Sequence, residues 1–212
     1  DSRWLATGWE EGIRLLPVGG GDPSQVREYR LPVGRSVADI RFDPDGRFLL
    51  VVSSIDAWVV PLDGGPCRQV VPAQERQIES GAVSPSGARV AIATFLGDGP
   101  CTLHVVDVAT GDSTTFDLPS PENKGGLPGG VISLDFIDEQ TLLTMGSGGL
   151  RRWDLVTGTH ELVVGFDGTT SRRPMRASRA AGTAIVWAYG SDLGAAFRRI
   201  DLASGSIHPI EG

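Results

Sequence analysis

The chain has 212 residues, of which 40% are hydrophobic and 21% are charged, a composition typical of a folded globular protein and not of a disordered one. Nineteen Lys and Arg residues stand against 26 Asp and Glu residues, and the formal net charge of −7 disfavours nucleic acid and anionic membranes as partners. An all-β protein of this length can form a single domain.

The cysteine content and the chain start suggest a compartment. Cys67 and Cys101 are the only cysteines, so we expect two free thiols and a reducing, cytoplasmic environment. No apolar run approaches the roughly 20 residues of a transmembrane helix, and the first residues do not resemble a signal peptide. Because the chain does not begin with Met, we expect it to belong to a longer polypeptide, and its single lysine, Lys124, is typical of a GC-rich bacterial genome.

The predicted elements, taken in chain order, repeat. A short apolar run that ends in a glycine turn occurs five times, and steps of 44, 46, 47 and 47 residues separate the last glycines of successive copies. These glycines are Gly21, Gly65, Gly111, Gly158 and Gly205. A period of this length is typical of propellers and other repeat architectures.

A tight turn between two apolar runs lies upstream of the glycine turn in each unit. The clearest copies are Asp43-Pro44-Asp45-Gly46 and Ser84-Pro85-Ser86-Gly87, in which proline presets one turn residue and glycine tolerates positive φ. Runs rich in β-forming residues follow, and no segment has sustained helical periodicity, so we expect almost no helix. We predict four strands per unit, the first unit lacking its innermost strand, in one domain over residues 1–212 with units at approximately 1–34, 35–76, 77–128, 129–170 and 171–212.

One stretch carries a family resemblance that the repeat extends to the whole chain. Residues 145–158 combine a small-residue loop, a strand that ends in Trp153-Asp154 and a Thr157-Gly158 turn. In these features the chain resembles the WD40 family, which implies an all-β propeller of four-stranded antiparallel blades. About five blades, the first incomplete, imply an open arc of a larger ring, which further blades from the same or another chain are needed to close.

The resemblance is incomplete and leaves one alternative open. The Gly-His dipeptide usual in WD40 blades is absent, and bacterial propellers similar to the periplasmic TolB protein share the Pro-Asp-Gly turn. A TolB-like periplasmic interaction propeller is therefore the second alternative for function. In either case we expect Trp58, Trp153 and Trp187, which fall in predicted strands, to lie in the core between blades.

Sequence motifs for catalysis or metal binding are missing. His104, His160 and His208 fall in predicted strands, and no Gly-x-Ser-x-Gly motif is present. The isolated cysteines do not suggest zinc, and Asp43–Gly46 lacks the later acidic ligands of a calcium loop. We expect no catalytic residue, no metal and no cofactor. Carboxylates on predicted innermost strands keep a ligand-binding or hydrolytic propeller enzyme open as an alternative; these are Asp39, Asp43, Glu79 and Asp135.

Two groups of residues are candidate interaction sites. Arg176 and Arg179 could form an anion site in the central channel, or else pair with Asp43 or Asp135. The resemblance implies a non-catalytic protein-interaction module, a scaffold or sensor in a larger bacterial signalling protein, whose partner is a protein or another domain of the same polypeptide. Aromatic residues and arginines predicted in loops at one rim would contact that partner: Trp9, Phe95, Leu96, Arg172 and Arg173.

Overall fold

The computed structural model describes residues 4–9, 12–18, 23–31, 37–72, 77–95, 101–118, 131–146, 149–165, 175–178, 180–188 and 196–210. Within these ranges the chain forms nineteen strands and one short 3-10 turn, η1 (Pro23–Gln25). None of the described segments is a helix long and apolar enough to cross a membrane. The expectation of almost no helix is confirmed for this part of the chain.

The strands form five antiparallel sheets that follow one another along the chain. The first sheet has three strands: β1 (Trp4–Trp9), β2 (Gly12–Pro17) and β3 (Arg27–Arg30). The second contains β4 (Val37–Phe42), β5 (Phe48–Ser53), β6 (Ala57–Pro61) and β7 (Arg68–Val71). The third contains β8 (Gln77–Val83), β9 (Arg89–Phe95), β10 (Cys101–Asp107) and β11 (Ser113–Leu118).

The last two sheets have four strands each. The fourth contains β12 (Val131–Phe136), β13 (Thr141–Gly146), β14 (Gly149–Asp154) and β15 (Thr159–Val164). The fifth contains β16 (Arg176–Ser178), β17 (Thr183–Ala188), β18 (Ala196–Asp201) and β19 (Ile207–Pro209).

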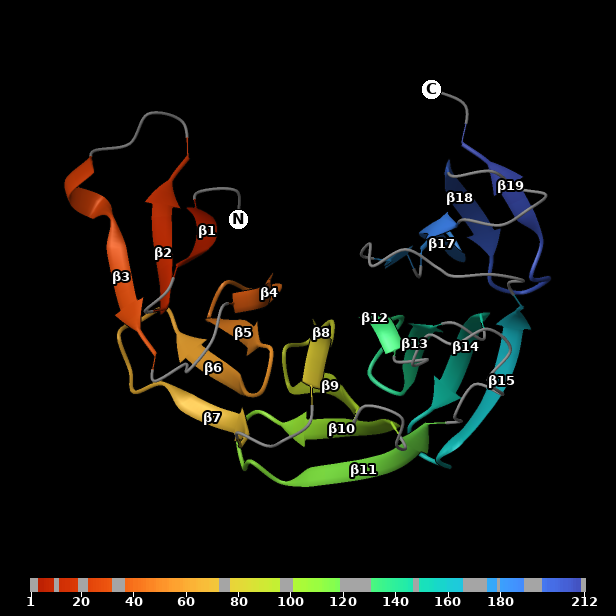
Figure 1. The fold of residues 1–212 in the computed structure, drawn as a ribbon, viewed down its shortest axis with the longest axis horizontal. Coiled ribbons are helices and arrows are strands. Elements are labelled where there is room, and N and C mark those ends of the chain that lie inside the picture. Colours follow the sequence, from red (N-terminus) through yellow and green to blue (C-terminus); the bar gives the residue numbers. More distant parts are fainter. Residues whose placement is uncertain are drawn as a thin grey trace.

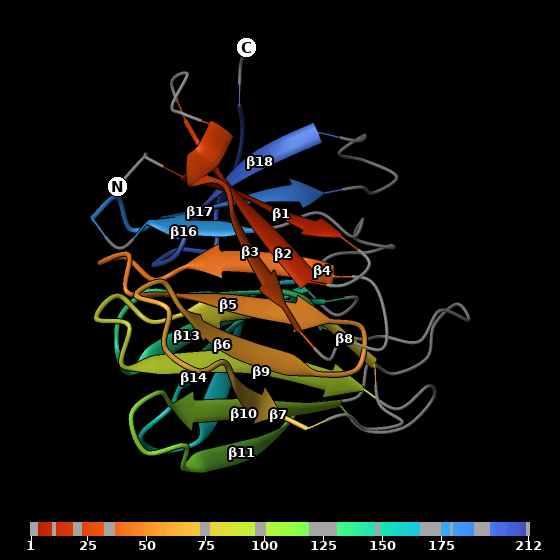
Figure 2. The ribbon, with the colours of Figure 1, turned by 90° about the vertical axis from the view of Figure 1, so that its left-hand side faces the viewer.

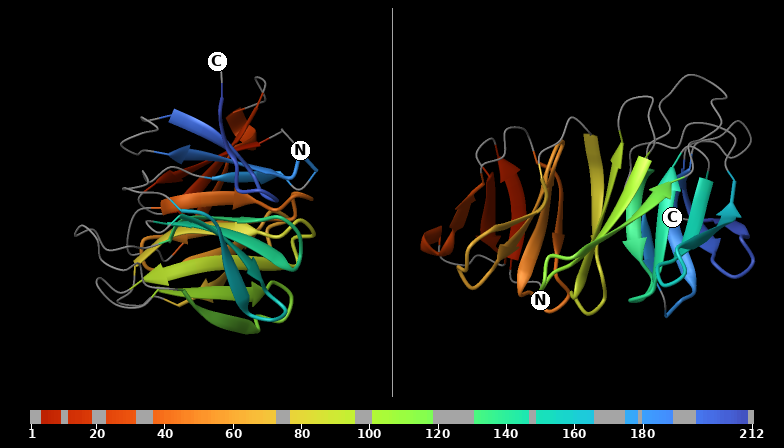
Figure 3. Two further views of the ribbon diagram at one scale, coloured as in Figure 1. Left: turned by 90° about the vertical axis from the view of Figure 1, so that its right-hand side faces the viewer. Right: turned by 90° about the horizontal axis from the view of Figure 1, so that it is seen from below.

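The five sheets stand side by side around an open arc (Figure 1), and Figures 2 and 3 show the same row from the sides and from below. The first strand of each four-stranded sheet lies on the inside of the arc and touches the corresponding strand of the next sheet. In the first sheet, β1 lies against β4 as β5 lies against β8, so β1 occupies the second position and the innermost strand is missing. The predicted four-stranded units, incomplete first unit and open arc are confirmed.

The two predicted turn types are present and have a clear physical basis. In the first type, Gly46 adopts a φ of +70° while the Asp43 carboxylate accepts the backbone N–H of Arg47. In the second, the carboxylate of Asp154 accepts the backbone N–H groups of Val156 and Thr157, and Gly158 closes the turn. The repeat visible in the sequence is therefore, in the four-stranded sheets, a repeat of hydrogen-bonded turns at one end of the sheet.

The hydrophobic core lies between the sheets, in one cluster for each pair of neighbours. All six side chains of β5 are buried, because a central strand of a sandwiched sheet has no solvent face. Trp153 is buried between the third and fourth sheets, as expected, and Trp58 packs beside the cluster of the first two sheets. The expectation for Trp187 is wrong: it makes an edge-to-face contact with Phe197 on the face of the fifth sheet that points away from the fourth, and no other described sheet covers that face.

Candidate functional site

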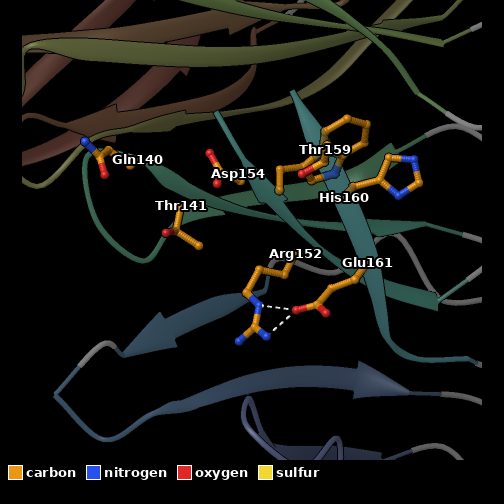
Figure 4. A pocket seen from close by; sticks show the side chains of 8 residues that line it. Gln140, Thr141, Arg152, Asp154, Thr159, His160 and Glu161 are labelled. Carbon is orange, nitrogen blue, oxygen red and sulfur yellow. Dashed lines mark hydrogen bonds and ion pairs between the residues drawn. The ribbon is translucent and has the colours of Figure 1, made fainter. Parts of the chain in front are cut away.

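The edge of the arc that carries the turns has two adjoining depressions over the fourth and fifth sheets. The first has a volume of about 370 Å³ (Figure 4). Its lining consists of turn residues and the paired ends of β14 and β15: Gln140, Thr141, Arg152, Trp153, Asp154, Thr159, His160 and Glu161. The second has a volume of about 450 Å³ and shares Thr141 and Arg152 with the first. These two residues therefore separate the depressions and line both.

An ion pair between Arg152 and Glu161 forms part of this boundary (Figure 4). The two residues are register partners on β14 and β15, and Arg152 Nε donates to Glu161 Oε1 at 2.7 Å. Arg152 Nη1 also donates to the carbonyl of Leu202 in the next sheet, at 3.2 Å. The side chain of Arg152 thus ties two sheets together while it lines the depressions.

Behind the depression, the Trp153 side chain is held on both sides. Its Nε1 donates to Thr144 Oγ1 at 2.9 Å, and both residues are buried. The imidazole of His160 lies against the indole with ring centroids 4.4 Å apart. Burial lowers the pKa of His160, and the charge of Arg151 lowers it further, so the neutral imidazole is favoured at neutral pH. The pocket floor is therefore rigid and aromatic.

The carboxylates at this edge are committed to their own turns. Hydrogen bonds from the backbone of Thr157 and Val156 lower the pKa of Asp154, and equivalent bonds lower the pKa of Asp107 and Asp201. These groups stay ionised at neutral pH and cannot act as acids. The turns at this edge therefore carry fixed negative charges.

Hydrogen bonds from arginine side chains to a turn carbonyl of the next sheet occur at several places along the arc. Arg27 Nη1 donates to the carbonyl of Leu62 at 2.8 Å, and Arg68 donates to the carbonyl of Val108. Leu62, Val108 and Leu202 occupy the same place in the turns of the second, third and fifth sheets, directly after β6, β10 and β18. The sequence analysis missed these ties. The repeat alignment could have located the acceptors, but not all the donors: Arg27 and Arg68 begin the last strands of their sheets, whereas Arg152 lies on the third strand of its sheet.

On the inside of the arc, a cavity of about 290 Å³ contains Arg176, one of the predicted channel residues. Arg176 is exposed and donates to the carbonyl of Met175 at 3.0 Å. Asp135 lines the same cavity, accepts the backbone N–H of Ala177 at 2.7 Å, and has a pKa raised by burial. An anion site in this cavity stays a prediction, and Arg179 lies outside the described residues.

The described inner-strand carboxylates do not all converge on one site, although Asp39 and Asp135 both lie near Arg41. Asp39 pairs with Arg41 at 2.9 Å, and Asp43, which is buried, pairs with Arg47 at 2.8 Å. The suggested pairing of the channel arginines with Asp43 therefore finds that carboxylate already engaged by Arg47. Of Glu79 only the backbone is described. Among the described residues, no group of three or more His, Cys, Asp or Glu side chains could hold a metal ion.

The predicted rim residues do not all have the expected positions. Trp9 is the last residue of β1, not a loop residue, and the Arg14 guanidinium lies 3.7 Å from its ring centroid. Phe95 is the last residue of β9 and is buried in the core between the third and fourth sheets. The prediction that Phe95 is exposed is wrong, because the strand extends further than the sequence suggested. Leu96, Arg172 and Arg173 lie outside the described residues, so the rim contact stays a prediction.

The histidines lie in three different sheets and do not form a catalytic site with a described nucleophile. His104 Nε2 is 3.2 Å from the hydroxyl of Thr94, the nearest approach to a nucleophile and base pair. Thr94 is only 1% exposed, so substrate cannot reach its hydroxyl. His160 packs on Trp153, and His208 is the register partner of Arg199 where β18 and β19 pair.

Comparison with solved structures supports the fold. The chain is similar to the structure of U3-55K, with a TM-score of 0.64 and 12% identity over 84% of this chain and 52% of that one. It is similar to the crystal structure of the RRP9 WD40 repeats, with a TM-score of 0.64 and 13% identity over 86% and 53%. The chain thus spans about half the length of these structures. No protein-family model and no curated protein matches the sequence.

The register of the sheets, the inward first strands and these similarities lead to one conclusion. The chain has the fold of a WD40-type β-propeller, of which it forms an open five-sheet arc with an incomplete first blade.

Proposed function

We propose that this chain is a non-catalytic protein-interaction module, which acts as a scaffold or sensor within a larger bacterial signalling protein. WD40-type propellers serve generally as protein-interaction scaffolds, and the fold supports that role here. Within the described residues, the polar side chains that could carry chemistry are engaged in turns and in ties between blades. This commitment of the reactive groups to the framework favours recognition over catalysis.

The surface that best suits a protein partner is the outer turn edge of the fourth blade. Val156, in the turn between β14 and β15, is 69% exposed, and Leu162 on β15 is also exposed. In sequence they lie close to Asp154, His160 and Glu161, which line the first depression and supply polar groups there. Exposed apolar residues with a polar surround are the usual anatomy of a protein interface. The first depression is open and mostly polar, which fits a polypeptide better than a small apolar ligand.

Binding measurements test this proposal. A partner captured with the wild-type chain would be identified and purified, then titrated against the double variant Val156→Glu/Leu162→Glu. We expect a loss of affinity of about tenfold or more, with the melting temperature unchanged because both side chains are exposed. Ile185→Glu is the matched control, since Ile185 is an exposed aliphatic residue in a different blade.

A second variant separates this surface from the rim predicted by the sequence. If Arg172→Ala/Arg173→Ala weakens binding and the turn-edge variant does not, the partner binds at the rim and the turn-edge site is wrong. Saturable turnover of a small molecule by the wild-type chain would overturn the non-catalytic proposal itself.

A further inference from the structure

On the outside of the arc, the last strand of each sheet pairs with only one other described strand. These outer strands are β3, β7, β11, β15 and β19, and Figure 1 shows them along the outer side of the row of sheets. A strand at the edge of a sheet has a row of backbone N–H and C=O groups that can pair with another chain. Proteins usually protect such edges with short strands, charged side chains, proline or an irregular register.

Four of the five outer strands have protection of this kind. β3 and β7 have four residues each, and both begin with an arginine. β19 has three residues and ends in Pro209. β15 has six residues, but its register with β14 shifts between Leu150 and Arg151.

The outer strand of the third blade, β11, has much less protection. It has six residues, Ser113–Leu118, and it pairs with β10 in an unbroken register. It contains no proline, glycine, lysine or arginine, and Asp117 is its only charged residue. Its two threonines and its phenylalanine favour a β conformation. A regular strand of this length and composition is suited to accept a further strand.

The hydrogen bonds of the hairpin show which backbone groups of β11 point outward. Asp107 N–H donates to the carbonyl of Asp112 at 2.9 Å, in the step of the ladder next to Ser113. Bonded and non-bonded pairs alternate along an antiparallel ladder. The N–H and C=O groups of Ser113, Thr115 and Asp117 therefore point away from β10, and all three residues are exposed.

The side chains along β11 indicate what kind of segment fits this edge. Phe116 is half-buried on one face, with its ring centroid 6.3 Å from that of Trp153, so an apolar side chain beside it would extend the core between the third and fourth blades. Asp117 is exposed on the opposite face, where its carboxylate suits a basic side chain. The formal net charge of −7 also favours a basic segment and disfavours a second copy of this chain.

We propose that β11 is a docking edge for an extended basic segment of a partner protein, which adds to the third blade as a fifth strand. The backbone of the segment pairs with Ser113, Thr115 and Asp117, while an apolar side chain lies beside Phe116 and a lysine or arginine pairs with the Asp117 carboxylate. The proposal rests on the proposed role in protein interaction, at a surface separate from the turn edge of the fourth blade.

A synthetic peptide titrated against the whole chain tests this site. The probe is an acetylated and amidated peptide of about eight residues in which valine and arginine alternate. We expect saturable binding, which Thr115→Pro weakens about tenfold or more because it removes one outward N–H and no hydrogen bond to β10. Thr115→Val is the matched control, since it changes the side chain and keeps the N–H that the proposal requires. Asp117→Asn should weaken binding most at low salt.

Two further measurements do not depend on the proline variant, should it fail to fold. The same peptide with every backbone nitrogen methylated keeps its side chains and charge but cannot donate to β11, so it should bind about tenfold or more weakly. In hydrogen exchange, the wild-type amides of Ser113, Thr115 and Asp117 should exchange quickly in the free chain and slowly with the unmethylated peptide.

The proposal is wrong if the wild type shows no saturable binding at up to about 1 mM peptide, or if the methylated and unmethylated peptides bind equally. A wild-type dimer that Thr115→Pro abolishes would assign the edge to a second copy and also overturn the proposal. If Val156→Glu/Leu162→Glu loses the peptide and Thr115→Pro retains it, the peptide binds at the turn edge. In that case the β11 site is wrong while the proposed function stands.

Discussion

The buried hydrogen bond between Trp153 and Thr144 gives a quantitative test of the fourth blade. Replacing Trp153 by Phe removes the Nε1–H that Thr144 accepts at 2.9 Å and leaves a small cavity between the third and fourth blades. The unsatisfied hydroxyl costs about 1–3 kcal/mol, and with the lost packing the free energy of unfolding should fall by about 2–4 kcal/mol. For a chain of this size the melting temperature should fall by about 5–15 °C.

A double-mutant cycle isolates the hydrogen bond from the packing. Thr144→Val should cost about 1–3 kcal/mol, because it leaves the indole N–H unpaired. The double variant should be less destabilised than the sum of the single variants by about 1 kcal/mol, since neither polar group remains. Free energies come from denaturant unfolding monitored by tryptophan fluorescence and circular dichroism.

Trp58 supplies the matched control. Its Nε1 is buried, and no described residue accepts a hydrogen bond from it. Trp58→Phe therefore sacrifices no hydrogen bond and should cost less than Trp153→Phe. Strict additivity in the cycle, or equal losses in the two tryptophan variants, would refute the argument.

Three further predictions concern the turns and the thiols. Gly46→Ala should lower the free energy of unfolding by about 1 kcal/mol through its positive φ alone, because a Cβ there contacts no other atom. Gly87→Ala should lower it by at least twice as much, because its Cβ would collide with the ion pair of Asp43 and Arg47. Denaturant unfolding of both variants measures the difference. Backbone hydrogen bonds lower the pKa of Asp154 in the folded chain, so its contribution to stability is present above the ordinary aspartate pKa of 3.8 and is lost as the pH falls through the folded pKa. Asp154→Asn should therefore reduce the drop in melting temperature between about pH 5 and pH 2, and an unchanged drop would contradict this role of the carboxylate. Cys67 is half-buried, with a pKa raised by burial, and Cys101 is buried. In the folded chain a thiol reagent should therefore modify Cys67 slowly and Cys101 hardly at all, whereas after denaturation without reductant it should modify both. One reactive thiol or none after denaturation would contradict free cysteines.

The free state of the cysteines was predicted from their number, and the structure agrees that both are free. The prediction succeeded because the two cysteines lie in different sheets at positions that are not equivalent: Cys67 precedes β7, and Cys101 begins β10. The placement of Phe95 failed because it depended on pairing with another strand, which the local sequence does not show. Phe95 was assigned to a loop because Gly97 follows closely, but pairing with β8 extends β9 through Phe95, and no local pattern reports that pairing.

What the sequence determined by itself was the repeat and its local chemistry. Glycine at positive φ and aspartate as an acceptor of turn N–H groups act within four or five residues, so spacing alone predicted the turns at Gly46, Gly111, Gly158 and Gly205. The same spacing predicted the strands between them and the incomplete first blade.

Only the tertiary structure decided which apolar faces are covered and which side chains meet across blades. Ile185 and Leu143 have the same pattern in the sequence, yet one is exposed and the other buried, because burial depends on whether a neighbouring sheet is present. The tie from Arg152 to the Leu202 carbonyl spans 50 residues and depends on the angle and spacing of two sheets. Such contacts depend on packing between units, which the periodicity of a single unit does not encode.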